Sequence, residues 1–422
     1  MLRPPAPEDE DNIMAALERS DRVCSIHLAV SSSLLKKLST ISEPFSELEE
    51  LVLLSQDNVQ STLPSAFWWG HRLHTLHSTR IAFPSLPQLL SPSQDLVDLQ
   101  LHEIPGAGYF SPEAFANALC GMTQLQTLSL HFLSFPPRRN YLALPPPPGD
   151  RIVLPALTCF KYRGISKYLD SLVARIDAPR LGDIDITFFS QPTLDVSQLG
   201  LFIDRIEMQM SPRRAEILSS GGAISISVTF TPPGALTRLG LKISCEQLDW
   251  QLFSISQICN HFSSFLFRVE DLGIKTIGLL SVPDDMDDKQ WLRLIHAFGG
   301  AKDLCVDGEL ATDILHALRS ADEEHKTVLP SLQNLHVQNP RFMDGRLRDS
   351  VESFVTQRRL SNHPVLIHPL QLVQQLSLLG TQPTLTGIRN PEDARVWQQQ
   401  QQVCLAITHL SSPFPSYPLE VA

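Results

Sequence analysis

Residues 96–101 read LVDLQL and residues 125–130 read LQTLSL, two copies of a run with leucine at its first, fourth and sixth positions. The same run returns every 23 to 32 residues, with other residues in place of leucine at some of its first, fourth and sixth positions. The exception is a longer break between residues 181 and 269. Its copies begin at Val23, Leu48, Leu73, Leu96, Leu125, Leu157, Leu181, Val269, Ala301 and Leu332. A pattern that returns at this spacing predicts an array of similar structural units.

The spacing within each run predicts which side chains are buried. The fourth and sixth residues, such as Leu99 and Leu101, lie two apart and therefore share one face of a strand. The pattern is a leucine-rich repeat signature, in which a short strand and a return segment bury their apolar faces only when neighbouring units stack. We expect an α/β fold, a leucine-rich-repeat solenoid of irregular repeats with parallel strands on the concave face and helices and turns on the convex face.

Composition and charge exclude several classes of function. The formal net charge is −11, and no basic run is longer than a pair, which argues against a nucleic-acid partner. The N-terminus, MLRPPAPEDEDN, is acidic where a signal peptide would be basic, and no apolar stretch approaches the ~18 residues of a spanning helix. Seven irregularly spaced cysteines without a CxxC pair favour a reducing compartment. We expect a cytoplasmic or nuclear protein with no membrane partner.

The limits of the repeat predict the domain organisation. We expect an acidic segment and capping helix over residues 1–19, the solenoid over residues 20–365, and a disordered Gln- and Pro-containing tail over residues 366–422. A proline-rich stretch at 135–150 predicts an extended loop inside the solenoid. Three strand-like runs joined by Gly and Pro turns predict a strand-rich insertion at 210–245.

Return segments between the strands are predicted to be mostly helical. The best marked is 111–119, with Ser111 as N-cap, Pro112 at the first helical position and Gly121 just past the end. In the N-terminal helix, Ile13, Ala16 and Leu17 are expected on one face. Further helices are expected at 33–38, 166–176, 196–208, 245–262, 287–298, 310–321 and 345–359, and only a turn or one-turn helix at 83–92.

The sequence carries no recognisable catalytic motif. It contains no Gly-rich phosphate loop, no GxSxG and no HExxH, so we expect neither an enzyme nor a cofactor. His102 and His131 occupy the same position of consecutive repeats, which predicts Cα atoms about 5 Å apart. With Cys159 or Asp98 nearby, a zinc site is geometrically conceivable, but no residue supplies a third ligand at comparable register. We expect no metal.

The strand positions that alternate with the buried ones predict a polar binding strip for a protein partner. The candidate binding residues are His77, Asp98, Gln100, His102, Ser129, His131, Lys161, Arg163, Asp183 and Asp185. We expect all of them to be exposed, with a basic pair beside an acidic pair, and exposed ion pairs contribute only about 0–1 kcal/mol. The histidines predict hydrogen bonding and some pH sensitivity near neutrality.

Three stretches resemble the fungal F-box and leucine-rich-repeat proteins. They are LPALTCFKYRGISKYLDSLVARIDAPRLGDIDITFF at Leu154–Phe189, LKISCEQLDWQL at Leu241–Leu252 and FRVEDLGI at Phe267–Ile274. The resemblance covers about residues 8–365. It implies that the repeats hold a ubiquitination substrate, and that an N-terminal F-box docks on the adaptor of a cullin-type ubiquitin ligase.

The chain departs from that family at its N-terminus, because it begins directly in the repeat region. Leu63-Pro64 runs into FWWGHR, and Leu86-Pro87 is followed by Pro92, which would interrupt a helix, so neither fits the opening of an F-box. We expect the ligase adaptor to bind only if an F-box lies outside this chain. The alternative is a truncated, F-box-less paralogue with no ligase role or no selected function.

Overall fold

The computed structural model describes residues 7–369 with internal gaps. The gaps are residues 39, 42, 56–60, 63–70, 84, 136–150, 190, 192–193, 195, 207–211, 221–222, 231–239, 247–250, 278–287, 324–326 and 339–344. Most of the proline-rich loop expected at 135–150, and the tail beyond residue 369, therefore lie outside the described residues. Strands and helices alternate along the described chain, which confirms the expected α/β class.

A 14-stranded sheet organises the described residues. Its strands, in spatial order, are β1 (Ser25–Val30), β2 (Glu50–Ser55), β4 (Thr75–Thr79), β6 (Asp98–Ile104), β7 (Thr127–Phe132), β9 (Cys159–Gly164), β11 (Asp183–Phe188), β14 (Gly240–Glu246), β13 (Ala223–Phe230), β12 (Pro212–Ser220), β15 (Asp271–Ile277), β16 (Asp303–Asp307), β17 (Asn334–Gln338) and β18 (Leu366–Pro369). Two short pairs lie outside it, β3 (Ser61–Thr62) with β5 (Ile81–Ala82), and β8 (Ile152–Val153) with β10 (Ile176–Asp177).

The parallel strands pair in the register that the repeat predicts. Leu76, Leu99, Leu128, Phe160 and Ile184 form one continuous row across β4, β6, β7, β9 and β11. All five side chains are buried, at 0% exposure. Because successive strand residues point to opposite faces, the side chains on either side of this row face the other way.

The strand-rich insertion is present as three strands, but their order in the sheet is reversed. Strand β14 pairs in parallel with β11, β13 is antiparallel to β14, and β12 is antiparallel to β13 and parallel to β15. The register places Ile186, Ile243, Ile226, Ile217 and Ile274 in one row across these strands. The row of apolar residues thus continues through the break in the repeat.

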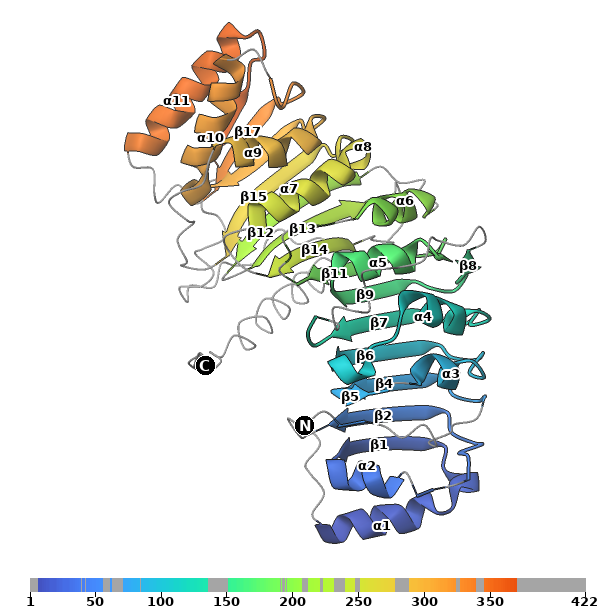
Figure 1. Cartoon of the computed structure of the whole chain (residues 1–422). Helices are drawn as coiled ribbons and strands as arrows, with labels where there is room; N and C mark the ends of the chain where they lie inside the picture. The colour runs from blue at the N-terminus through green and yellow to red at the C-terminus, as the bar shows by residue number, and fades with distance from the viewer. Residues whose placement is uncertain are drawn as a thin grey trace, which may run out of the picture. The chain divides into compact units, whose positions relative to one another are not determined.

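Helices cover one face of the sheet, as Figure 1 shows for α3 to α6. The α-helices are α1 (Pro7–Leu17), α2 (Ser32–Leu38), α3 (Leu86–Leu90), α4 (Pro112–Leu119), α5 (Ser166–Val173), α6 (Ser197–Arg205), α7 (Gln251–His261), α8 (Ser263–Leu266), α9 (Asp288–Ile295), α10 (Gly308–Glu323) and α11 (Gly345–Leu360). Short 3-10 helices are η1 (Ser20–Arg22), η2 (Gly106–Gly108) and η4 (His296–Phe298). Neighbouring helices pack on one another, and their apolar sides close over the buried strand positions.

Helix α4 forms as its local sequence predicts. The Ser111 hydroxyl accepts a hydrogen bond from the Ala114 amide at 3.1 Å, and Pro112 is the first helical residue. Gly121 adopts φ +93°, a left-handed conformation that costs glycine little. Start and stop signals of this kind act within one turn of the chain, which is why the sequence alone locates this helix.

Helix α6 is capped by a residue from the preceding unit. Its N-cap position is Val196, whose side chain cannot accept a hydrogen bond. The Asp170 carboxylate of α5 accepts instead from the amides of Gln198 at 2.7 Å and Leu199 at 3.0 Å. The cap therefore also joins two neighbouring units.

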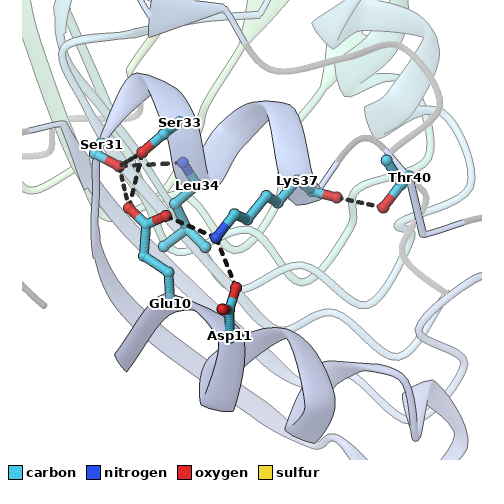
Figure 2. A network of polar contacts seen from close by, with 7 residues as sticks. All are labelled: Glu10, Asp11, Ser31, Ser33, Leu34, Lys37 and Thr40. Atoms are coloured by element: carbon cyan, nitrogen blue, oxygen red, sulfur yellow. Dashed lines mark hydrogen bonds and ion pairs between the residues drawn. The ribbon is translucent and has the colours of Figure 1, made fainter. Parts of the chain in front are cut away.

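The N-terminal helix is attached by a polar network rather than by apolar contacts alone (Figure 2). Glu10 accepts hydrogen bonds at 2.8 Å from the hydroxyls of Ser31 and Ser33, and its second oxygen lies 3.2 Å from the Lys37 ammonium. Lys37 also bonds Asp11 at 2.8 Å. The hydrogen bonds from Ser31 and Ser33 lower the pKa of Glu10, and burial raises it. The hydrogen bonds outweigh burial, so this pKa lies below its ordinary value of 4.5.

The structure corrects three details of the sequence prediction. Cys245 lies in β14, paired with Phe188, and not at the start of the helix expected at 245–262. Residues 366–369 form β18, which pairs with β17, so the prediction of disorder is wrong for these four residues. Ala16 is exposed, because α1 turns Leu17 into the core and leaves Ala16 beside its polar face.

Candidate functional site

The ten predicted binding residues lie on five neighbouring strands, β4, β6, β7, β9 and β11, on the face opposite the helices. We call the positions that alternate with the buried rows on these strands the open face. Its rows run in register, for example Asp98, Thr127, Cys159 and Asp183 in one row. The structure brings all ten residues together on one surface.

At one side of the open face, a histidine and an amide bind the same carboxylate. His77 Nε2 lies 2.8 Å from Asp98 Oδ2. Gln100 Nε2 donates to the two oxygens of Asp98 at 3.1 and 3.0 Å. The side chains of His77 and Asp98 are 32% and 27% exposed, so the contacts hold them in place while leaving them within reach of a partner.

At the centre of the open face, two imidazoles stack over a serine. The rings of His102 and His131 lie 4.6 Å apart with an interplanar angle of 14°. The Ser129 hydroxyl is 2.9 Å from His102 Nε2 and 3.4 Å from His131 Nε2, so it can donate to one ring and accept from the other. Ser129 is only 1% exposed. The prediction that it is exposed is wrong, because the two rings cover it.

The pKa values of both stacked histidines lie below the ordinary value of 6.5. Burial, followed by the nearby charges of His102, Arg163 and Lys161, lowers the pKa of His131 to about 4. Burial also lowers the pKa of His102 from its ordinary value of 6.5, as do His77 and Lys161. The expected pH sensitivity near pH 7 is therefore wrong for this pair, which stays neutral there.

Lys161 and Arg163 bring positive charge next to the stacked histidines, on strand β9. Lys161 is exposed, and Arg163 is half-buried with its guanidinium 6.0 Å from the centre of the Phe189 ring. The register pairs Lys161 with Asp185 and Arg163 with Thr187. Lys161 therefore lies opposite an acidic residue across β9 and β11, whereas Arg163 does not.

Asp183 is offset from the basic residues and contacts a thiol instead. Cys159 Sγ lies 3.6 Å from Asp183 Oδ2. Burial, together with the negative charge of Asp183, raises the pKa of Cys159 to about 11. A thiol with so high a pKa is a poor metal ligand and a poor nucleophile. Among the described residues, no group of three or more His, Cys, Asp or Glu side chains is placed to hold a metal ion.

A second polar cluster lies on β16, β17 and β18, and of its members the sequence had placed only His336 on the polar strip. Asn334 Nδ2 donates to Asp303 Oδ1 at 2.7 Å, and His368 Nε2 lies 3.1 Å from Asn334 Oδ1. The rings of His336 and His368 stack at 4.9 Å. The runs at Ala301 and Leu332 would have placed Asp303, Asn334 and His336 on one face, but nothing in the sequence marks His368 as part of a strand.

Comparison with known proteins adds no assignment. The chain matches no model of a known protein family, and it matches no curated protein sequence. Within the described ranges, no helix combines the length and the apolar character needed to cross a membrane.

Proposed function

We propose that this protein is a non-enzymatic recognition module, a leucine-rich-repeat solenoid whose open face binds a partner protein. The observation that carries the proposal is the row of contacts His77–Asp98 and His102–Ser129–His131, which holds polar side chains in fixed positions across neighbouring strands. Side chains that are ordered before binding lose less entropy on binding, so such a surface favours a specific partner.

The charges at the centre of the open face favour a partner that presents a carboxylate to Lys161 and Arg163. His102 and His131 are neutral at pH 7 because burial lowers their pKa values. The adjacent positive charge therefore comes from Lys161 and Arg163. Asp98, four residues before His102 on β6, is held by His77 and Gln100. Complementary charges of this kind steer association and select between partners.

The partner that we propose is a ubiquitination substrate, held as the repeats of fungal F-box proteins hold theirs. The support is the resemblance of residues 154–189, which include β9 and β11 of the open face, to that family. Binding to a ligase adaptor is proposed only for the case that an F-box lies outside this chain. The proposed compartment is the cytoplasm or the nucleus.

An affinity purification tests the proposal. The tagged protein and its Lys161→Glu plus Arg163→Glu variant are used to capture proteins from a cell extract, and the captured proteins are quantified by mass spectrometry. A second variant, Lys167→Glu plus Arg180→Glu, makes the same change of charge at exposed residues outside the open face. We expect a partner that binds the native protein and the second variant but not the first.

Two results would contradict the proposal. One is a set of captured proteins that is the same for the native protein and the open-face variant. The other is equal loss in both variants, which would attribute binding to overall charge and not to the open face. Circular dichroism of the three proteins confirms that each is folded before the comparison is made.

A further inference from the structure

A groove lies among the helices of the C-terminal half, away from the open face. Its main cavity, of about 790 Å³, is lined by residues of α7, α9 and α10 and by Thr327 and Val328 ahead of β17. A second cavity of about 440 Å³ shares His296, Thr327 and Val328 with the first and extends the groove to Phe267. Figure 1 shows α7, α9 and α10 as neighbours in this part of the fold.

One wall of the groove is basic. Lys289, Arg293 and His296 line it from α9 and η4, at positions four and three residues apart that share one side of a helix. The opposite side of α9 buries Trp291 and Leu294 in the core. The periodicity of α9 therefore separates an apolar side, which packs against the core, from a basic side, which faces the groove.

Negative charge is limited among the lining residues that the structure describes. Among its described lining residues, Asp288 is the one carboxylate. Its Oδ2 lies 2.9 Å from Nδ1 of His316, which is not part of the lining. The described lining of the groove thus carries two cationic side chains, Lys289 and Arg293, against one carboxylate, in a chain with a formal net charge of −11.

The remainder of the groove is apolar. Leu292, Ala321 and Val328 contribute to the main cavity. Phe267, which lines the second cavity but not the first, is 57% exposed, whereas most of the phenylalanines that the structure describes are buried. An inorganic anion would neutralise the basic wall and leave this apolar surface in contact with water.

We propose that this groove is a second docking site, which binds an acidic peptide segment of a partner protein that also carries an apolar side chain. The acidic residues lie along Lys289 and Arg293, and the apolar side chain covers Phe267. A peptide that combines both features matches the charge and the apolar surface of the groove along its length. This site is separate from the open face and does not depend on the function proposed for it.

Fluorescence anisotropy with the full chain tests this proposal. The probe is a fluorescein-labelled peptide of alternating Glu and Leu residues that ends in Phe, and the matched probe has Gln in place of each Glu. We expect the acidic probe to bind and the Gln probe to bind roughly tenfold more weakly or worse. Added salt should weaken binding of the acidic probe, because ions screen exposed charges.

Variants assign the binding to the groove. Lys289→Glu plus Arg293→Glu should weaken binding of the acidic probe by roughly tenfold or more, since it reverses the charge of the wall. The control, Lys167→Glu plus Arg180→Glu, makes the same change of charge elsewhere and should leave binding unchanged. Phe267→Ser should weaken binding of both probes.

Several outcomes would overturn the proposal. They are no binding of the acidic probe to the native chain, equal binding of the acidic and Gln probes, and equal loss in the groove and control variants. Binding of inorganic phosphate or of anionic phospholipid vesicles that depends on Lys289 and Arg293, without peptide binding, would assign the groove to another ligand.

Discussion

Arg358 of α11 and Asp322 of α10 form an ion pair sealed from solvent, with Arg358 Nε 2.8 Å from Asp322 Oδ2 and both side chains 0% exposed. Arg358 Nη1 also donates to the Leu329 carbonyl at 2.9 Å, and its guanidinium lies 5.2 Å from the centre of the Phe354 ring. The pair therefore links the last two helices to the segment ahead of β17.

Replacing Asp322 with Ala should destabilise the fold by about 3–5 kcal/mol, because it leaves the Arg358 charge buried without its partner. Urea unfolding followed by circular dichroism measures this change. Asp349→Ala, at an exposed carboxylate on α11, is the matched control and should stay within about 0.5 kcal/mol.

Replacing both partners, by Asp322→Leu with Arg358→Met, should restore most of the stability lost in the single variant. Apolar side chains of similar size avoid the cost of burying two charges. A double variant as unstable as Asp322→Ala, in the same urea experiment, would show that the pair itself is required.

Glu10→Gln should loosen α1, since it removes the charge that binds Ser31, Ser33 and Lys37. We expect a loss of roughly 1–2 kcal/mol in the local stability of the helix. Hydrogen exchange of the amides of residues 7–17 measures it. Glu18→Gln, at an exposed carboxylate beside the end of the same helix, should exchange as the native chain does.

The effect of Glu10 should depend on pH. Its folded-state pKa lies below the ordinary value of 4.5, so the folded chain releases this proton more readily than the unfolded chain. The stabilisation is therefore present above about pH 4.5 and is lost as pH falls through the lowered pKa. Equal differences between native and Glu10→Gln exchange rates at pH 7 and well below pH 4 would contradict this assignment.

Leu99→Ala or Leu128→Ala should cost about 2–5 kcal/mol in the free energy of unfolding, since both side chains are at 0% exposure in the sheet core. Thr127→Ala, on the open face, should stay within about 0.5 kcal/mol. Thermal and urea unfolding compare the three. Similar losses at positions 127 and 128 would mean that the strand register is wrong.

His131→Asn should reduce the loss of stability on acidification. The pKa of His131 in the fold is about 4, against 6.5 ordinarily, so the unfolded chain takes up this proton first. The neutral ring stabilises the fold fully above about pH 6.5, and this contribution is lost as pH falls from 6.5 to 4. Melting temperatures across this range, compared with those of the exposed-site variant His71→Asn, measure it.

Much of the sheet, and the face on which the candidate site lies, could be predicted from the short-range sequence pattern. Residues two apart on a strand must share a face, so the LxxLxL run alone placed Leu99 and Leu128 in the core and Asp98, His102 and His131 on the open face. The capped ends of α4 were predictable for the same reason, because Ser111 and Gly121 act on amides and carbonyls within one turn.

Contacts between units were beyond that pattern. The partners of Glu10 lie in the next unit, and the cap of α6 comes from Asp170. Arg358 stands beside Arg359 in the sequence, and nothing there marks it as buried. The reversed order of β12, β13 and β14 is also a matter of pairing, since each strand alone has the same apolar alternation whichever neighbour it takes.

The sequence by itself determined which face of each strand is buried, because side-chain alternation is a property of the backbone and needs no neighbour. Only the tertiary structure decided the chemistry of the open face. The rings of His102 and His131 stack on each other and cover Ser129. Their burial lowers their pKa values. Burial depends on which side chains meet across strands that are distant in the chain.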